Sequence, residues 1–171
     1  MHKRSGFTLI ELTLVTVIIL TLVGLSVPLF RKTFADLTAK DTTFNISKLI
    51  SYAQERAVVD RKNFKITFNF TSGYYQLLES QTSEGKVVYK AIRGRFGKAF
   101  NLPQGLSFKD KDSENAQARK EEYKKEIVFY PDGRSDPIAI DMLDKNMAGY
   151  RITSKGFGSA SVGIKEVKDE R

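Results

Sequence analysis

The chain has no cysteine and no tryptophan, and its single histidine is His2. Without cysteine, the chain can form no disulfide bond, no thiolate metal site and no thiol nucleophile. Histidine is the commonest general base and metal ligand of enzymes, and here it stands at the second position. We therefore expect a protein that is not an enzyme and that holds neither a cofactor nor a metal ion.

Acidic residues are in the minority, with 20 Asp and Glu against 28 Lys and Arg, for a net charge of +8. Loss of Lys3 and Arg4 with an N-terminal segment would leave 26 basic residues and a charge of +6. Such an excess favours acidic partners, which include nucleic acid, anionic lipid and other protein subunits. In a chain of this size, such an excess is more often simply a solvated surface. A chain of 171 residues suits one domain with an attached segment.

Charge is almost absent from residues 7–30, FTLIELTLVTVIILTLVGLSVPLF, where Glu11 is the one ionised side chain. At about 1.5 Å per residue, this run would form a helix about 36 Å long, enough to cross a bilayer core of about 30 Å. Apolar residues surround the helix axis, which excludes an amphipathic surface helix. The sequence therefore predicts a transmembrane helix at residues 7–30, preceded by the short basic leader of residues 1–6.

Three interpretations of this segment remain open on composition alone. It can be a plain single-pass anchor, or a secretory signal peptide with Gly24 and Ser26 as the small residues of its cleavage site. Both leave Glu11 unexplained, although an ionised carboxylate in a bilayer costs about 2.5 kcal/mol or more. The third interpretation is a processed segment in which Glu11 meets a partner of opposite charge.

The residues Gly6-Phe-Thr-Leu-Ile-Glu-Leu12 resemble the processing site of type IV prepilins and type II secretion pseudopilins. The resemblance implies that a membrane prepilin peptidase cleaves between Gly6 and Phe7, and that Phe7 becomes N-methylated. It implies that Glu11 compensates the freed ammonium of a neighbouring subunit in a filament, in agreement with the cost of an unpaired buried charge. Pro28 stands where many family members carry a proline that loosens the helix.

Basic residues flank the apolar run on both sides, so the positive-inside rule barely decides its orientation. The resemblance does decide it, because the peptidase acts on the cytoplasmic side. It implies a single-pass protein of the bacterial inner membrane, with a cytoplasmic N-terminus and a periplasmic C-terminal domain. The implied partners are other pilins or pseudopilins, the prepilin peptidase, membrane lipid and an assembly platform.

A helical pattern continues beyond Pro28, because apolar residues recur mostly at steps of three and four. These residues are Phe30, Phe34, Leu37, Phe44, Leu49, Tyr52, Ala53 and Ala57. We predict an amphipathic continuation at residues 31–62 that buries one face and ends near Asp60 to Asn63. The whole helix would then have about 50 residues.

The apolar period changes to two after Asn63, where Phe64, Ile66, Phe68 and Phe70 alternate with polar residues. This alternation predicts a half-buried strand, followed by a turn at residues 71–73 and a returning strand at 74–78. Further strands are expected at 86–92, 106–108, 127–130, 138–142, 150–153 and 159–165. We predict an α+β, pilin-like fold in which a two-sheet antiparallel β domain, residues 63–171, packs on the long helix. Residues 110–125 are expected to form a polar loop.

The C-terminal part narrows the resemblance to the GspH/FimT group of minor pseudopilins, in which a strand ends in Phe-x-Pro-x-Gly. Here the motif is Phe129-Tyr-Pro-Asp-Gly133, followed by apolar strands and the Gly-rich residues 156–162. The segment Lys155-Gly156-Phe157-Gly158 departs from the usual Thr-Gly-Arg-like turn of the group. The implied function is that of a structural subunit of the pseudopilus of a type II secretion system, which supports export across the outer membrane. The alternative is a minor pilin of a type IV pilus that binds DNA during DNA uptake.

Two polar clusters are weaker candidates. Basic residues alternate with aromatic ones in the middle of the chain, a pattern that can bind a nucleic acid backbone while rings stack on bases. These basic residues are Lys86, Lys90, Arg93, Arg95 and Lys98. The second cluster, Asp110, Asp112 and Glu114, is spaced like the start of a calcium loop, but the required glycine is missing. For the first cluster, we expect a strand whose aromatic side is in the core and whose basic side faces solvent. For the second cluster, we expect no metal ion.

Overall fold

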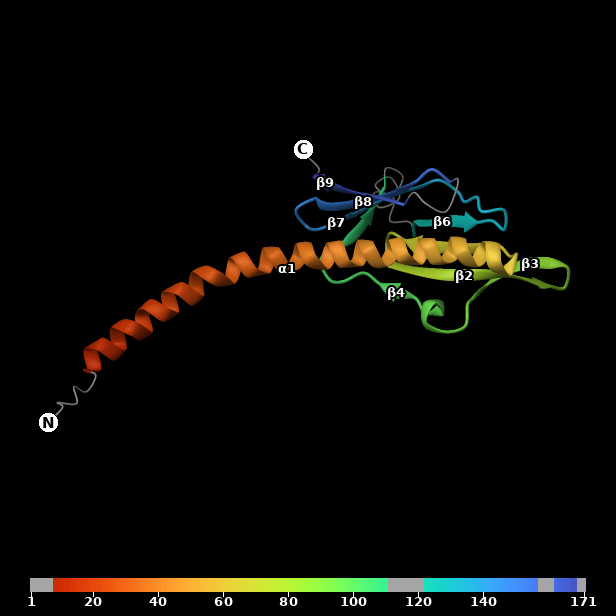
Figure 1. The fold of residues 1–171 in the computed structure, drawn as a ribbon. Helices are drawn as coiled ribbons and strands as arrows, with labels where there is room; N and C mark the ends of the chain where they lie inside the picture. The colour runs from red at the N-terminus through yellow and green to blue at the C-terminus, as the bar shows by residue number, and fades with distance from the viewer. Residues whose placement is uncertain (1–7, 111–121, 157–161, 169–171) are drawn as a thin grey trace. The chain divides into compact units, whose positions relative to one another are not determined.

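The computed structural model of the chain describes residues 8–110, 122–156 and 162–168, apart from the side chains of residues 25–33, 35 and 168. The chain divides into two compact units, Met1–Asp36 and Leu37–Arg171. A single helix, α1 (Leu9–Asp60), contributes to both units. The second unit contains all the strands, and Figure 1 shows the second half of α1 running beside them.

The end of α1 lies within the predicted range. The helix has 52 residues and stops at Asp60, where Arg61 takes a left-handed conformation with φ of 51°. The Lys62 N–H donates to the Ala57 carbonyl oxygen at 3.3 Å, which is the 6→1 hydrogen bond of a Schellman motif at a helix C-terminus. Glycine is the usual residue at such a position, and its absence hides this stop signal in the sequence.

The second half of α1 buries one face against the sheets, as predicted, but part of that face was predicted wrongly. Its buried apolar residues, none more than 3% exposed, are Ala39, Ile46, Leu49, Ile50, Ala53 and Ala57. In contrast, Phe34, Leu37 and Phe44 are 65%, 49% and 53% exposed. Phe44 precedes Leu49 by five residues. In a helix with 3.6 residues per turn, two residues that far apart lie on different faces, so Phe44 cannot share the buried face of Leu49. Phe30 lies outside the described side chains.

Two buried threonines hid the true face of α1 from the sequence analysis. Thr42 and Thr43 are 7% and 0% exposed, and they fill the turn between Ala39 and Ile46. Their hydroxyls donate to the carbonyl oxygens of Thr38 and Ala39 at 2.7 and 2.8 Å. Because these hydroxyls are satisfied within the helix, the two side chains can be buried at little cost.

The first sheet follows the order β3-β2-β1-β6, with β4 paired to β2. The bounds are β1 (Phe64–Asn69), β2 (Tyr74–Ser83), β3 (Lys86–Ala91), β4 (Phe100–Asn101) and β6 (Lys124–Phe129). The predicted alternation of β1 is confirmed, because Phe64, Ile66 and Phe68 are at most 2% exposed. The prediction missed β4 and the 3-10 helix η1 (Arg95–Gly97).

The opposite face of β1 is more buried than predicted, with Thr67 and Asn69 only 8% and 0% exposed. The Asn69 carboxamide oxygen accepts hydrogen bonds from the N–H groups of Thr71 and Ser72, at 3.0 and 2.8 Å. Its nitrogen donates to Glu122 at 2.7 Å. The buried amide thus shapes the β1–β2 turn through its oxygen and ties it to the segment before β6 through its nitrogen.

The second sheet follows the order β5-β7-β8-β9. Its strands are β5 (Ser107–Lys109), β7 (Ile138–Leu143), β8 (Ala148–Ser154) and β9 (Gly163–Lys168). The strand predicted at 159–165 begins later, and residues 157–161 lie outside the described residues. The sheets share one core with α1, in which the Phe108 ring meets Phe68 edge to face at 5.5 Å. The predicted helix with a two-sheet antiparallel domain is confirmed.

The Phe-x-Pro-x-Gly motif forms a turn that contacts α1. Gly133 has a φ of 83° and donates its N–H to the Tyr130 carbonyl oxygen at 3.0 Å, which closes the turn. The Gln54 side chain of α1, only 7% exposed, donates to the Gly133 carbonyl oxygen at 3.1 Å. Gln54 is therefore polar on a buried face because it anchors this turn to the helix.

The buried face of α1 gives a first prediction. Ile46→Ala should lower the free energy of unfolding by about 2–5 kcal/mol, because it empties a fully buried site. Phe44→Ala removes a larger side chain, but one that is 53% exposed, and should cost about 1 kcal/mol or less. Chemical denaturation of both variants measures the difference. A larger loss of unfolding free energy for Phe44→Ala than for Ile46→Ala would contradict the assignment of the buried face of α1.

Gly156 gives a second prediction, with Gly105 as its control. Both have positive φ, 81° and 93°, but a Cβ at Gly156 would lie 2.5 Å from the Ser135 carbonyl oxygen, whereas a Cβ at Gly105 would meet nothing within 4 Å. Gly105→Ala should cost about 1–2 kcal/mol, from backbone strain alone. Gly156→Ala should cost more, because Ser135 must also move. Equal losses in the free energy of unfolding would show that this close approach is readily relieved.

Candidate functional site

The N-terminal end of α1 is held by a capping arrangement that the sequence analysis missed. Thr8 precedes the first helical residue, and its hydroxyl oxygen accepts the N–H of Glu11 at 3.3 Å. Its carbonyl oxygen accepts the N–H of Leu12 at 3.2 Å. Thr8-Leu-Ile-Glu11 has the spacing of a capping box, so the signal was present in the sequence. The predicted cleavage residues, Gly6 and Phe7, lie outside the described residues.

Glu11 lies in the first turn of α1, where the helix dipole favours an anion. The hydrogen bond to Thr8 uses the backbone of Glu11 and leaves its carboxylate available for other contacts. Between Thr8 and Gly24 no other side chain carries a charge. The structure thus places one anion close to the start of a long apolar helical segment, as the sequence predicted.

Large apolar side chains are exposed along the described start of α1. From Leu9 to Val23 they are between 44% and 83% exposed, and they occur on all sides of the helix. The hydroxyls of Thr13, Thr16 and Thr21 donate to backbone carbonyl oxygens of the preceding turn, at 2.8–2.9 Å. Such threonines carry no unsatisfied polar group into an apolar environment. A surface of this kind is expected to be covered by lipid or by other helices.

Two further features of α1 concern the predicted transmembrane helix and the predicted effect of Pro28. Among the residues whose side chains are described, no helical stretch is long and apolar enough to span a membrane. The helical backbone continues through Pro28, whose side chain lies outside this description.

The five basic residues of the mid-chain cluster come from three places in the fold. Lys86 and Lys90 lie on β3, Arg95 and Lys98 lie in and after η1, and Arg93 lies between these elements. All five side chains are exposed. Lys90 is paired in register with Glu79 of β2, which offsets part of its charge.

The aromatic residues of this cluster already have intramolecular partners. Phe96 lies 4.6 Å from Tyr52 of α1, and Phe100 stacks on Tyr75 at 5.4 Å, measured between ring centroids. The Lys65 ammonium lies over the Tyr89 ring, 4.3 Å from its centroid. The expected single strand with a core side and an exposed basic side is only partly found, because Lys86 and Lys90 lie on β3, whereas Phe96 and Phe100 lie on η1 and β4. Nucleic-acid binding stays a prediction.

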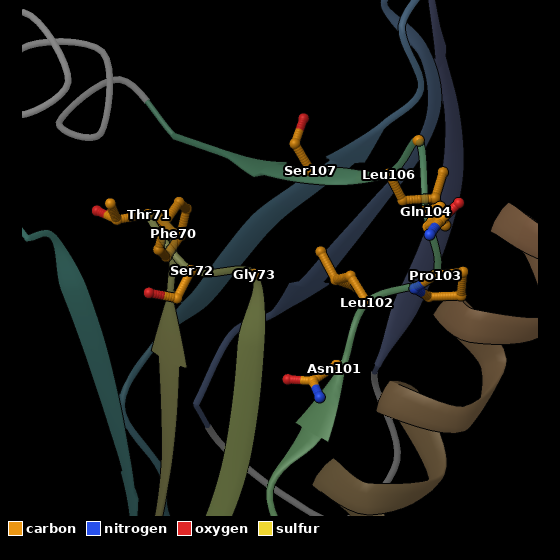
Figure 2. Close-up of a pocket in the computed structure, with 11 residues that line it drawn as sticks. Phe70, Thr71, Ser72, Gly73, Asn101, Leu102, Pro103, Gln104, Leu106 and Ser107 are labelled. Carbon is orange, nitrogen blue, oxygen red and sulfur yellow. The ribbon is translucent and has the colours of Figure 1, made fainter.

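No described group of three His, Cys, Asp or Glu side chains could hold a metal ion. Asp110 pairs with the Lys125 ammonium at 2.5 Å, while Asp112 and Glu114 lie outside the described residues. A cavity of about 280 Å³ lies beside the β1–β2 turn and the loop before β5 (Figure 2). Its lining, Phe70–Gly73 and Asn101–Ser107, contains no charged side chain, so it lacks the groups of an acid–base site.

No protein-family model matches the sequence, and no curated protein matches it either. Two solved structures of the minor pseudopilin EpsH, from the type II secretion system of Vibrio cholerae, are similar in fold. One is 14% identical with a TM-score of 0.56, and the match covers 77% of this chain and 96% of that one. The other is 13% identical with the same TM-score, and covers 78% and 98%. This chain therefore has the pilin-like fold of a GspH-type minor pseudopilin, a long helix packed on two antiparallel sheets.

Proposed function

We propose that this protein is a minor pseudopilin, a structural subunit of the periplasmic pseudopilus of a type II secretion system that supports protein export across the outer membrane. The observation that carries the proposal is the fold, since the match covers nearly the whole chain of each EpsH structure. The N-terminal sequence supports it independently, because Gly6, Phe7 and Glu11 stand in the order of a prepilin processing site.

In this proposal, a prepilin peptidase removes residues 1–6 and methylates Phe7. Residues 7–30 hold the subunit in the inner membrane, with its N-terminus in the cytoplasm and residues 63–171 in the periplasm. On assembly, the apolar side chains of α1 leave lipid for contact with the helices of other pilins or pseudopilins. The chain itself performs no catalysis, and the peptidase and an assembly platform are its other partners.

Glu11 would set the position of the subunit along the filament. Its carboxylate is costly within an apolar bundle unless an opposite charge compensates it. The ammonium of Phe7 on a neighbouring subunit supplies that charge only when the two helices are correctly offset. The favoured offset is therefore the one in which both charges are paired. Pro28 would allow the helix to adapt where it leaves the membrane.

The second candidate is a minor pilin of a type IV pilus that takes part in DNA uptake. The exposure of all five basic residues of the mid-chain cluster favours it. Binding through these residues would weaken steeply with added salt, because each phosphate contact releases counterions. Export does not require this property, so the two functions differ in a measurable way.

The processing step can be tested by mass. Expressed with a prepilin peptidase, the chain should lose residues 1–6 and gain one methyl group on Phe7. Intact-mass spectra and the N-terminal peptide report both changes. A Gly6→Leu variant serves as the control and should keep its leader. A mature start near Val27, or retention of the leader beside an active peptidase, would contradict the proposal.

The role of Glu11 can be separated from that of the helix cap. Glu11→Leu removes the charge but keeps the backbone hydrogen bond to Thr8, and it should reduce crosslinking to partner pilins in membranes. Thr8→Ala removes the cap, worth about 1 kcal/mol, but keeps the charge, and it should assemble nearly normally. Both variants should still be inserted and cleaved, which is monitored in the same samples.

Three outcomes would oppose this role of Glu11. Normal crosslinking and normal export by Glu11→Leu would show that charge pairing does not position this subunit. Loss of cleavage without any other defect would place Glu11 in recognition by the peptidase. If Thr8→Ala reduces crosslinking as strongly as Glu11→Leu, assembly depends on the capped start of the helix rather than on the charge of Glu11.

A further inference from the structure

A pocket of about 260 Å³ lies within the second unit, where α1 faces the segment after β3. Asn45, Lys48 and Leu49 of α1 form one side of it. Tyr75 of β2 and the residues Arg95, Phe96 and Phe100 complete the lining. The pocket combines three aromatic rings with two cations and one carboxamide, and it contains no acidic side chain.

The aromatic part of the pocket is preformed. Phe100 stacks on Tyr75, and Phe96 is held by Tyr52, at centroid distances of 5.4 and 4.6 Å. Both phenylalanines pack against the hydrophobic core. Rings that are fixed in this way lose little conformational entropy when they bind an apolar group.

Tyr75 brings an unused polar group to this apolar lining. The residue is only 6% exposed, and burial raises the pKa of its phenol. Among the described residues, its hydroxyl has no hydrogen-bond partner. No fully buried polar side-chain atom in the described part of the chain lacks a partner, so this hydroxyl must retain some accessible surface. It is a donor that a ligand in the pocket can use.

The two cations of the pocket are exposed and lack acidic partners. No described carboxylate lies within ion-pair distance of Lys48 or Arg95, whereas Arg56, Lys65 and Arg151 each pair with an acidic residue. Instead, the Lys48 ammonium lies 4.3 Å from the centroid of Phe44, and the Arg95 guanidinium carbon lies 5.8 Å from that of Phe96. The positive charge is thus held beside rings and is available to an anion.

We propose that this pocket binds an acidic segment of another polypeptide through one aromatic or large aliphatic side chain with carboxylates beside it. The apolar side chain would contact Leu49, Phe96 and Phe100, and Lys48 and Arg95 would bind the carboxylates. Tyr75 and Asn45 offer hydrogen bonds to the bound backbone. A volume of about 260 Å³ is below the range of about 300–1,000 Å³ of most small-molecule sites, and suits one or two side chains.

A nucleic acid fits the pocket less well. Its aromatic rings are packed against Tyr52, Tyr75 and the core, so they are not free to stack on successive bases. The inference goes beyond the proposed function and does not depend on it, because the pocket lies outside the processing segment and can be tested by binding alone.

The experiment uses the full chain in neutral detergent and measures the fluorescence anisotropy of labelled peptides. The probe is Glu-Asp-Phe-Asp-Glu. Its controls are Glu-Asp-Ser-Asp-Glu, which lacks the ring, and Lys-Lys-Phe-Lys-Lys, which lacks the anions. The first peptide should bind at least about tenfold more tightly than either control, because only it uses both the rings and the cations.

Variants of the protein locate the binding site. Lys48→Gln with Arg95→Gln should weaken binding of the acidic aromatic peptide about tenfold. Lys90→Gln with Lys98→Gln removes the same charge outside the pocket and should weaken it about twofold at most. Tyr75→Phe should reduce affinity without loss of folding, because it removes only the hydroxyl. Thermal unfolding of each variant is recorded to exclude a global effect.

Several results would overturn the inference. It fails if the acidic aromatic peptide does not bind at millimolar concentration, or if the two charge-matched double variants behave alike. Preferential binding of 3-phenylpropanoate would make this a site for a small acid. Salt-sensitive binding of duplex DNA that the Lys48 and Arg95 variant abolishes would make it a nucleic-acid site.

Discussion

The burial of one face of α1 against the β domain is the contact on which the rest of the second unit depends. Ile46, Leu49 and Ile50 lie in the same core as the apolar residues of both sheets. Gln54 extends this contact to the Phe129–Gly133 segment by a hydrogen bond to the turn. Because strands of both sheets pack on one helix, the position of each sheet is set by the helix rather than by the loops that connect the strands.

The same helix meets a different requirement in its first half. There the apolar side chains are exposed, and the threonine hydroxyls are satisfied by the helix itself. A surface of this kind is stable only in lipid or among similar helices. Glu11 is the exception, because its carboxylate is the one charge among these side chains and is costly to bury unless an opposite charge pairs with it. The two kinds of surface thus lie on separate stretches of one element: the exposed apolar side chains lie in the first half of α1, and the face buried against the sheets lies in the second half.

The pocket between α1 and the segment after β3 depends on a part of the fold that carries little regular structure. η1 and β4 are short, yet they place Arg95, Phe96 and Phe100 against α1. Basic residues that looked like a single cluster in the sequence are divided by this geometry. Arg95 joins Lys48 in a pocket, while Lys86 and Lys90 stay on a strand at the edge of the first sheet.

The sequence by itself determined the long helix, its end near Asp60, the alternation of β1 and most of the strands. These features follow from periodicity and local composition, which act over a few positions. The pilin-like character of the fold was implied by the resemblance of residues 6–12 to a prepilin processing site. Thr8 as helix cap was equally readable but was overlooked. Only the tertiary structure decided which face of α1 is buried, because Thr42, Thr43 and Gln54 are polar and become compatible with burial through specific hydrogen bonds. It alone brought Lys48 and Arg95 into the lining of one pocket, since the two residues are 47 positions apart and their approach depends on how the helix and sheets pack.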